Sequence, residues 1–286
     1  MANTNGWGDG ASNNNIGWGQ GANNVIGWGD SHSNSWAGAT DIVGGGSTPS
    51  FTNQYSMLFD GIDESFNVGS TPLNLRFNRL DTFSFSAWVK VDTSKGNQIL
   101  CNQLAPSTNY RGYYFAVQSN NQVRVILRST LSDSLIYTST TILSNGLWYH
   151  IVFTYDGTAT TTGGNIYINN TLDTLTRTGT LTGTMSSTDS LYIGSRNSAD
   201  NFFDGNLDEV AIFNTELSAS DVSTIFNNGV PTDISSLSPL SHWRMGENAT
   251  WNGSTWTLTD QGSGGNNATS VNMEEADKTG DQPYVI

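Results

Sequence analysis

Positive charge is scarce in this sequence. Only 13% of its 286 residues are charged, and 11 Lys and Arg face 25 Asp and Glu, so the formal net charge is −14. The usual charged share is about 25%. A chain with so few cations has little with which to neutralise a run of phosphates or the headgroups of an anionic membrane. We therefore expect neither nucleic acid nor a membrane surface as its partner.

Cysteine and long apolar runs are also lacking. The single Cys101 excludes a disulfide framework within the chain and any zinc site with several cysteine ligands. No apolar run approaches the ~20 residues of a transmembrane helix, and no cationic segment followed by an apolar one opens the sequence. We expect no membrane insertion and no export by a standard leader.

What the sequence does contain, first of all, is a Gly-Trp-Gly repeat in residues 1–38, with copies separated by Asn and Ser. Each copy carries one tryptophan: Trp7, Trp18, Trp28 and, in a decayed copy, Trp36. The segment has few other apolar residues with which to build a core. A large ring between glycines can be buried in a pocket of another chain. We interpret residues 1–38 as a docking arm sheltered by a partner or by sister copies; a sticky, unstructured tail is the alternative. The Gly-rich residues 39–50 are predicted to be a linker.

Short runs of alternating apolar and polar residues follow from about Tyr55 onward. Hydrophobic residues make up 36% of the sequence, enough for a packed core. Runs of roughly four to eight residues with a period of two, separated by turn signals such as Asp156-Gly157, are typical of an antiparallel β-sandwich. Val210–Phe213 is apolar at every position, which predicts burial on both faces. The clearest alternation is at Phe83, Phe85, Ala87, Val89 and Val91, at Tyr113, Phe115 and Val117, at Val123, Val125 and Leu127, and at Leu147, Tyr149, Ile151 and Phe153.

One helix is predicted, over Leu217–Phe226. Ser218 has the side chain of an N-cap residue, and Asp221 stands three residues later, as in a capping box. Val222, Ile225 and Phe226 then form one apolar stripe. Gly229 follows, where a helix commonly ends.

Four stretches, in this order, resemble the laminin G-like branch of the concanavalin A-like jelly rolls. The resemblance implies two packed antiparallel sheets with a short helix at the end of the domain. It also implies a family whose members mostly bind glycans, proteins or each other. We expect an all-β jelly-roll sandwich over residues 51–230, with one short helix and the extended N-terminal arm. The stretches are Tyr55–Glu64, Phe83–Lys90, Leu147–Gly157 and Phe203–Asn214, the last followed by the helix.

The C-terminal extension, residues 231–286, has the texture of a lead-in that usually precedes such a domain. This texture lies in Leu240–Glu247 and in Asp260–Thr269. Because an unpaired sheet edge invites aggregation, we expect the extension to fold back onto its own sandwich. Pairing with a neighbouring subunit is the alternative.

Together the arm, the laminin G-like body and the trailing segment resemble virion structural proteins of tailed bacteriophages, such as fibre, decoration or tail-associated proteins. The resemblance implies assembly in the host cytoplasm, virion proteins and sister copies as partners, and a cell-surface glycan as a further one. Two other functions stay open. One is an extracellular lectin or adhesin module of a bacterium, and the other is a divergent polysaccharide hydrolase.

A calcium ion at the rim of the sandwich is also implied by the resemblance. Asp60 and Asp208 match positions that recur in the family, and Gly61 could add a carbonyl oxygen; such oxygens suit a hard cation. Alternatively, these aspartates accept backbone N–H bonds in a turn and at a strand end. For a glycan, which needs an exposed aromatic and a polar side chain, the candidates are Tyr110 and Arg111.

Catalysis is not expected. Glycosidases with this architecture place three carboxylates on one strand in a Glu-x-Asp-x-x-Glu pattern, which this sequence lacks. The adjacent Asp208 and Glu209 are predicted to point to opposite faces of a strand. His32, His150 and His242 are expected to be packed or surface residues rather than bases, and Cys101 to be buried and inert.

Overall fold

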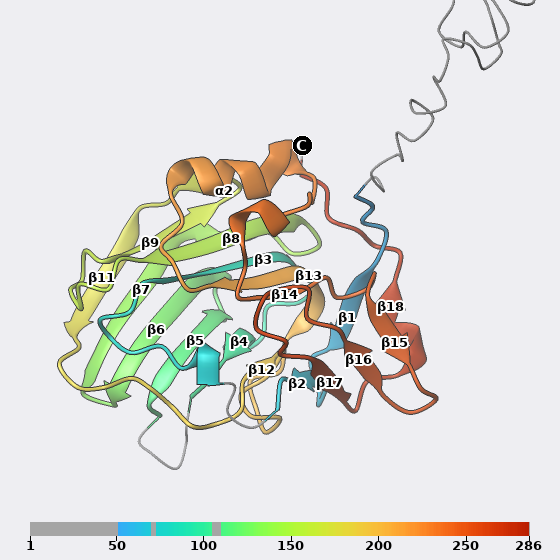
Figure 1. Cartoon of the computed structure of the whole chain (residues 1–286), viewed down its shortest axis with the longest axis horizontal. Helices are drawn as coiled ribbons and strands as arrows, with labels where there is room; N and C mark the ends of the chain where they lie inside the picture. Colours follow the sequence, from blue (N-terminus) through green and yellow to red (C-terminus); the bar gives the residue numbers. More distant parts are fainter. Residues whose placement is uncertain (1–50, 70–72, 105–109, 286) are drawn as a thin grey trace, which may run out of the picture. The chain divides into compact units, whose positions relative to one another are not determined.

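The computed structural model describes residues 51–69, 73–104 and 110–285. The predicted arm and linker, with Trp7, Trp18, Trp28 and Trp36, lie outside them. By its contacts the chain separates into two units after Phe51, and the second unit, Thr52–Ile286, contains the fold drawn in colour in Figure 1. Its described strands form two antiparallel sheets, which confirms the predicted all-β sandwich.

The first sheet has eight strands among the described residues. Its order is β10-β9-β8-β3-β13-β1-β18, and β14 pairs with β13 beside this path. The long central strands correspond to the most regular alternation in the sequence. The bounds are β1 Ser56–Asp60, β3 Phe83–Val91, β8 Trp148–Tyr155, β9 Gly164–Ile168, β10 Thr171–Leu172, β13 Asp204–Phe213, β14 Ser241–Trp243 and β18 Lys278–Thr279.

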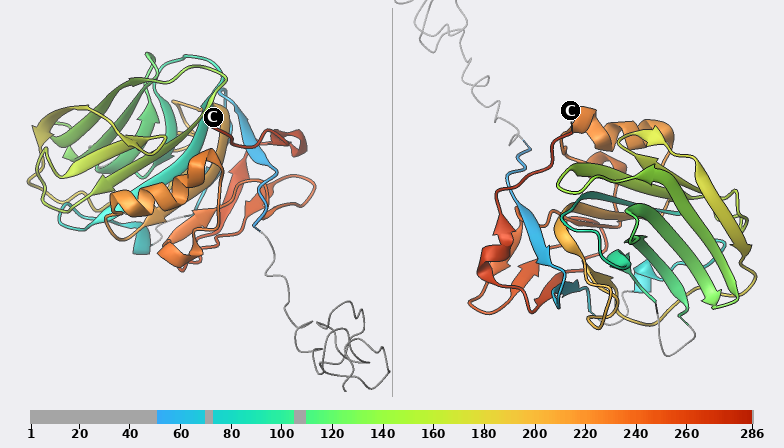
Figure 2. Two further views of the ribbon diagram at one scale, coloured as in Figure 1. Left: turned by 90° about the horizontal axis from the view of Figure 1, so that it is seen from above. Right: turned by 180° about the vertical axis from the view of Figure 1, so that it is seen from behind.

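The second sheet has ten strands in the described part of the chain, in the order β11-β7-β6-β5-β4-β12-β2-β17-β16-β15. Figure 2 shows it from two further sides. The bounds are β2 Ser65–Asn67, β4 Gln98–Asn102, β5 Gly112–Val117, β6 Gln122–Thr130, β7 Asp133–Ile142, β11 Leu175–Thr180, β12 Tyr192–Ile193, β15 Ala249–Trp251, β16 Trp256–Leu258 and β17 Ala268–Val271.

The main core fills the space between the two sheets. On β3, Phe83, Phe85 and Val89 turn inward, and Phe115 of β5 faces them from the other sheet. The rings of Phe85 and Phe115 stack with centroids 4.2 Å apart. Aromatic residues thus bridge the two layers, as the period-two pattern predicted.

A second cluster covers the outer face of the eight-stranded sheet. Ala211 and Phe213 of β13 face this cluster, whereas Val210 and Ile212 face the main core, so the strand is buried on both sides. The cover is α2 (Ala219–Phe226), whose Val222 and Ile225 are buried in the cluster. No helix among the described residues is long and apolar enough to cross a bilayer.

The start of α2 confirms the predicted capping box. Ser218 Oγ accepts the backbone N–H of Asp221, and the Asp221 carboxylate accepts the backbone N–H of Ser218. The helix ends at Asn227, which has a φ of 44°, and not at Gly229. Asparagine tolerates this left-handed conformation better than most residues, so it serves as the C-cap.

The described residues of the C-terminal extension pair with both sheets of their own chain. Strand β14 lies along β13, β18 pairs with β1, and β17 pairs with β2. Trp243 of β14 is completely buried in the main core. These three pairings extend the sheets with strands from the end of the chain.

Candidate functional sites

One candidate site lies on the outer face of the ten-stranded sheet. On β6, Val125 and Leu127 point into the main core, so the alternating residues Arg124 and Arg128 lie on the opposite face. Tyr114 on the neighbouring β5 is paired with Ile126, between the two arginines. The strands therefore present two guanidinium groups on either side of one aromatic residue.

The loop between β12 and β13 adds a third arginine to this face. The backbone N–H of Ile99 donates to the carbonyl of Asn201 (3.0 Å), which fixes the loop against β4. The Arg196 guanidinium lies 5.4 Å from the centroid of the Tyr110 ring, in a cation–π contact, and its Nε donates to Asp200 (2.6 Å). We call Arg124, Arg128 and Arg196, gathered around Tyr114, the arginine face.

A pocket of about 70 Å³ opens on the arginine face. Its polar groups are two amides and two guanidinium groups, and its apolar groups are an aromatic ring and two aliphatic side chains. The lining residues are Asn97, Ile99, Leu104, Tyr114, Arg128, Arg196 and Asn201. Polar groups that converge beside apolar side chains are typical of ligand sites, which usually measure about 300–1,000 Å³, so this pocket has room for one substituent of a ligand.

The electrostatics of the pocket reflect burial next to like charges. Burial lowers the pKa of the Arg128 guanidinium, and the nearby Arg124 and Arg196 lower it further. Burial also raises the pKa of Tyr114, an effect that the same three arginines partly oppose. The Nε atoms of Arg124 and Arg128 are buried and have no hydrogen-bond partner within the described chain.

The two predicted glycan contacts lie at different places relative to this pocket. Tyr110 has a φ of 59°, unusual for a tyrosine, and its ring lies against Arg196. Arg111 is half-buried and does not line the pocket. The sequence analysis missed Arg128, Arg196 and Asn201, because the loop that brings the last two to β4 carries no pattern that predicts its path.

A second candidate site lies in the eight-stranded sheet, where β13 changes partner from β1 to β14. The pairing of β13 with β3 shifts register between Asp208 and Ala211, and Glu209 has a φ of 46°. This is a β-bulge. It corrects the prediction that Asp208 and Glu209 point to opposite faces. Carboxylate oxygens of Asp208, Glu209 and Glu247 lie within 4.8 Å of one another, and we call this group the carboxylate cluster.

One guanidinium group and one imidazole contact the carboxylate cluster. Glu209 accepts Nε of Arg244 at 2.9 Å and contacts Nε2 of His242 at 2.5 Å. The Asp208 side chain accepts the amide of Asn53 at 2.8 Å. Asp208 is completely buried and Glu209 is 5% exposed. Two of the three carboxylates are thus buried, and their partners His242 and Arg244 lie on β14 and just after it.

Burial and crowding raise carboxyl pKa values in the carboxylate cluster. Burial, followed by the adjacent Glu209 charge, holds the pKa of Asp208 well above its ordinary value, and burial raises that of Glu247. Two buried oxygens lack any partner among the described groups: Oδ1 of Asn53 and Oε2 of Glu247. Unsatisfied oxygens beside crowded carboxylates are a donor set that suits a hard cation.

The predicted metal ligands are not brought together. Asp60 is paired with Asp204 across β1 and β13, four residues from Asp208 along the strand. At roughly 3.3 Å per residue the separation is about 13 Å, too far for one ion. The Asp60 carboxylate instead accepts the backbone N–H of Ile62 (2.7 Å) in a turn at Gly61, whose φ is 71°. Asp208 is the only one of the three predicted ligands that belongs to the carboxylate cluster.

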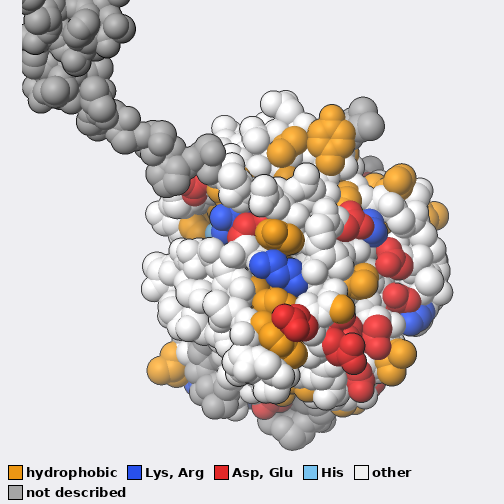
Figure 3. Space-filling model, turned by 90° about the vertical axis from the view of Figure 1, so that its right-hand side faces the viewer, with side chains coloured by type: hydrophobic (Ala, Val, Ile, Leu, Met, Phe, Trp, Pro, Cys, Tyr) orange, Lys and Arg blue, Asp and Glu red, His pale blue; other side chains and the backbone are white. Residues whose placement is uncertain are grey.

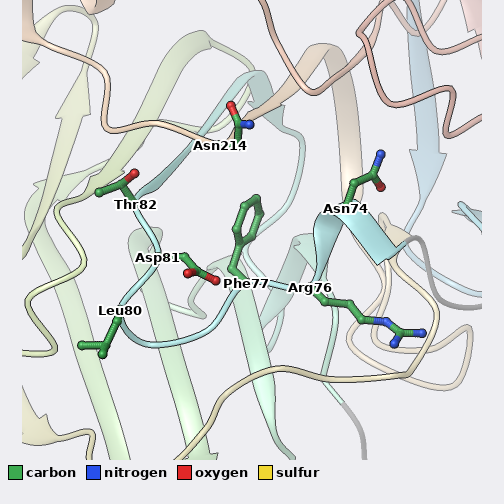
Figure 4. A pocket seen from close by; sticks show the side chains of 7 residues that line it. All are labelled: Asn74, Arg76, Phe77, Leu80, Asp81, Thr82 and Asn214. Carbon is green, nitrogen blue, oxygen red and sulfur yellow. The ribbon is translucent and has the colours of Figure 1, made fainter.

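A larger hollow, of about 420 Å³, lies beside the segment that leads into β3 (Figure 4). The ring of Phe77 stands in it and stacks on Phe83 with centroids 4.6 Å apart. The guanidinium of Arg76 points away from Asp81, so the charged groups do not converge. The lining residues are Asn74, Arg76, Phe77, Leu80, Asp81, Thr82 and Asn214.

The other residues considered for chemistry are enclosed. Cys101 is completely buried, and burial raises its pKa far above the ordinary value. His150 is buried and shares a hydrogen bond of 2.9 Å with Ser86; burial lowers its pKa to about 3. His32 lies outside the described residues. Figure 3 shows the side of the molecule around β15 to β18, where acidic side chains gather and Lys and Arg are scattered.

Comparison with known proteins agrees with this architecture. A family model described as the Concanavalin A-like lectin/glucanases superfamily, Laminin_G_3, matches residues 63–223. A search of curated proteins finds no match.

Among solved structures, a candidate carbohydrate binding protein from Bacteroides ovatus aligns with a TM-score of 0.57 and 16% identity. The alignment covers 82% of this chain and 62% of that one. A heptameric SAP-like pentraxin from Limulus polyphemus aligns at 0.44 with 15% identity, over 60% of this chain and 82% of that one. The CBM40 of a Ruminococcus gnavus sialidase aligns with a TM-score of 0.43 and 10% identity, and the alignment covers 61% of this chain and 99% of that one. The family match spans more than half of the sequence, and the chain belongs to the Concanavalin A-like lectin/glucanases superfamily, in its laminin G-like branch.

Proposed function

We propose that this chain is a carbohydrate-binding, lectin-type module and that the sugar binds in the pocket on the arginine face. The observation that carries the proposal is the lining of that pocket, where the amides of Asn97 and Asn201 and the guanidinium of Arg128 surround Tyr114. The Bacteroides ovatus protein that shares the fold is described as a candidate carbohydrate binding protein, which supports the proposal.

The chemistry of a sugar suits this lining. Amides and guanidinium groups are planar and can make paired hydrogen bonds to neighbouring hydroxyls. An aromatic ring provides apolar area for the C–H face of a pyranose. Tyr114 lines the pocket, and the half-buried Tyr110 lies against Arg196, which also lines it.

A binding assay with paired variants tests the proposal. We expect Asn201→Ala and Tyr110→Ala to weaken saccharide binding about tenfold, because the first removes a lining amide and the second removes the ring that holds Arg196. Asn214→Ala, in the separate hollow of Figure 4, is the matched control and leaves affinity unchanged. The measurement is a glycan array followed by calorimetry on the full chain. Equal affinities for the three variants, or no saccharide bound at all, would contradict the proposal.

We also propose that binding occurs without hydrolysis. The proposal is supported by the enclosure of the carboxylate cluster, in which Asp208 is completely buried and Glu209 is engaged by Arg244 and His242. A glycosidase needs two carboxyl groups that reach its substrate. Release of new reducing ends from any saccharide bound by the chain would overturn this proposal.

For calcium we propose the carboxylate cluster in place of the predicted Asp60 and Gly61. The residues that would hold the ion are Asp208, Glu247 and Asn53, whose unpartnered oxygens support the assignment. The ion would offset the crowded negative charge. We expect millimolar Ca²⁺ to raise the melting temperature relative to excess EDTA, and Glu247→Gln to reduce the shift, because a ligand of the native state stabilises it. An identical melting temperature in both buffers would refute the site.

We propose further that the chain is a virion structural protein, anchored through the tryptophan repeat. Its support is the recurrence of Trp7, Trp18, Trp28 and Trp36 in the sequence, since many weak contacts repeated over many copies give avidity. Intrinsic fluorescence of the full chain, with and without phage particles, tests it. A blue shift on mixing is expected. Emission that does not change, with no co-sedimentation, would contradict the role.

A further inference from the structure

The arginine face concentrates positive charge that lacks matching acids. Three of the chain's 11 Lys and Arg lie there, although the formal net charge is −14. Within the described parts of the chain, Asp200 is the one acid at ion-pair distance from these three, and it pairs with Arg196. The face therefore keeps an excess of positive charge in an acidic protein.

The strands hold these guanidinium groups in fixed places. Arg124 is paired with Ala116 and Arg128 with Gly112, and the backbone of Gln103 and Leu104 lies where a side chain on Gly112 would be. Both Nε atoms are buried and have no hydrogen-bond acceptor among the described residues. A buried donor is normally paired, but the Nε atoms of Arg76, Arg111 and Arg177 are in the same state, so what distinguishes this face is the gathering of three arginines around Tyr114.

We propose that the arginine face selects an anionic saccharide, one with a carboxylate or sulfate group, and that Arg128 and Arg196 hold this group above Tyr114. The inference rests on the proposed function, because it names the class of sugar that the same pocket takes. Guanidinium forks match carboxylate and sulfate oxygens, and the hydrogen bonds are charge-assisted. A neutral sugar would leave the positive charges without a partner.

The neighbouring strands extend the surface on which such a sugar chain would lie. Arg124 is paired with Thr138 of β7, which in turn is paired with Thr176 of β11. These three residues form a row across the sheet, and Thr176 is exposed. Threonine hydroxyls both donate and accept hydrogen bonds. A second or third sugar residue would therefore meet polar groups along this row.

Calorimetry on the full chain with matched oligosaccharides tests the inference. The probes are tetragalacturonate, its methyl ester, a κ-carrageenan tetrasaccharide, which carries sulfate but no carboxylate, cellotetraose and a ten-nucleotide thymidine strand. We expect tetragalacturonate or the sulfated probe to bind at least tenfold more tightly than the neutral probes, and to weaken as salt rises. The two anionic probes decide between carboxylate and sulfate.

Two substitutions separate recognition from folding. Arg128→Gln is expected to lower the affinity for the anionic probe about tenfold, because one charge-assisted contact is lost. Arg76→Gln is the control: it makes the same change at another half-buried arginine with an unpartnered Nε, in the hollow of Figure 4, and leaves the affinity unchanged. Asp200→Asn is expected to raise the affinity severalfold, since it removes the carboxylate that competes for Arg196. A misfolded protein would not bind more tightly.

Several outcomes would overturn the inference. Equal binding of tetragalacturonate and its methyl ester, together with loss of both in Asn201→Ala, would leave the proposed function standing and refute the anionic preference. The absence of binding to every saccharide would refute both. Binding of the thymidine strand as tight as that of the anionic sugar would mean that the face recognises anions without regard to the sugar.

Discussion

The arginine face and the carboxylate cluster differ in the sign of their charges, in their burial and in the opposite charge that lies beside them. Around Tyr114, guanidinium groups gather with little negative charge beside them, next to a pocket that opens to solvent. Around Asp208 and Glu209, buried carboxylates gather, and Glu209 is in contact with the Arg244 guanidinium group and the His242 ring. The charges of the arginine face have one acid beside them, whereas two of the three carboxylates are buried beside a guanidinium group.

The two regions differ in how much stability is lost when one cation is removed. Taking a cation away from an enclosed pair leaves a buried carboxylate without compensation, at a cost of about 3–5 kcal/mol. Taking one away from a group of like charges relieves repulsion and costs little. Substitutions in the carboxylate cluster should therefore lower the free energy of unfolding more than substitutions in the arginine face. The affinity for a saccharide should show the opposite order.

The largest effect is expected from Arg244→Met. This substitution leaves Glu209 without its 2.9 Å guanidinium partner and breaks the contact between Arg244 and the carbonyl of Thr52. We expect the free energy of unfolding to fall by about 3 kcal/mol, measured by urea denaturation at neutral pH. A loss below about 1 kcal/mol would mean that the carboxylate cluster does not depend on this cation.

The two buried histidines sharpen the comparison at acidic pH. His242 faces Glu209, whereas the hydroxyl of Ser86 and the rings of Trp88 and Phe226 lie beside His150. Because the pKa of His150 is lowered to about 3, its contribution to stability is present above about pH 6.5 and is lost as the pH falls towards 3. We expect a loss of roughly 2–3 kcal/mol between pH 7 and pH 4.5. A His150→Gln variant should lack this part of the acid slope, and an unchanged slope would contradict the assignment.

The buried carboxyl group of Glu64, which lies outside both regions, tests the link between burial, pKa and stability at alkaline pH. Glu64 is 5% exposed, lies near Asp277, and accepts the backbone N–H of Asp60 at 2.6 Å. Burial is the main cause that raises its pKa to about 8, so the folded protein holds a proton that the unfolded chain has released. The stabilising contribution is complete below about pH 4.5 and is lost as the pH rises through 8. Between pH 6 and pH 8 we expect a loss of about 2 kcal/mol.

Glu64→Gln mimics the protonated carboxyl group and supplies the control for this slope. The variant should be more stable than the natural chain at pH 8 and should lose less stability between pH 6 and pH 8. Thermal melts at several pH values measure both. Parallel stability curves for the two proteins would show that Glu64 is ionised in the fold.

The smallest effect on stability is expected from Arg128→Gln. Its guanidinium has like charges as neighbours and no acid at ion-pair distance within the described part of the chain. We expect the free energy of unfolding to change by no more than about 0.5 kcal/mol, even though the affinity for an anionic sugar falls. A destabilisation as large as that of Arg244→Met would remove the distinction between the two regions.

Much of the fold was predictable because its signals are local. The alternation of Phe83, Phe85 and Val89 survives in β3, and the capping box at Ser218 starts α2 as expected. The sites were harder to predict, because each joins segments that are distant in the sequence. Asp208 was identified, but its partner Glu247 is 39 residues away along the chain, and Asp60 was wrongly grouped with it.

The tryptophan arm, the linker and the domain boundaries stay predictions, since the arm and the linker lie outside the described residues. The proposed calcium ion likewise depends on a measurement.

By itself the sequence determined the period of the strands, the position of the helix, the family and the overall acidity, because neighbours along the chain fix these properties. Only the tertiary structure decided which charges meet. The bulge at Glu209 turned two adjacent carboxylates towards the same space, and the loop before β13 carried Arg196 to the arginines of β6. Contacts of this kind depend on strand register and loop path, which are set by the packing of the whole sandwich.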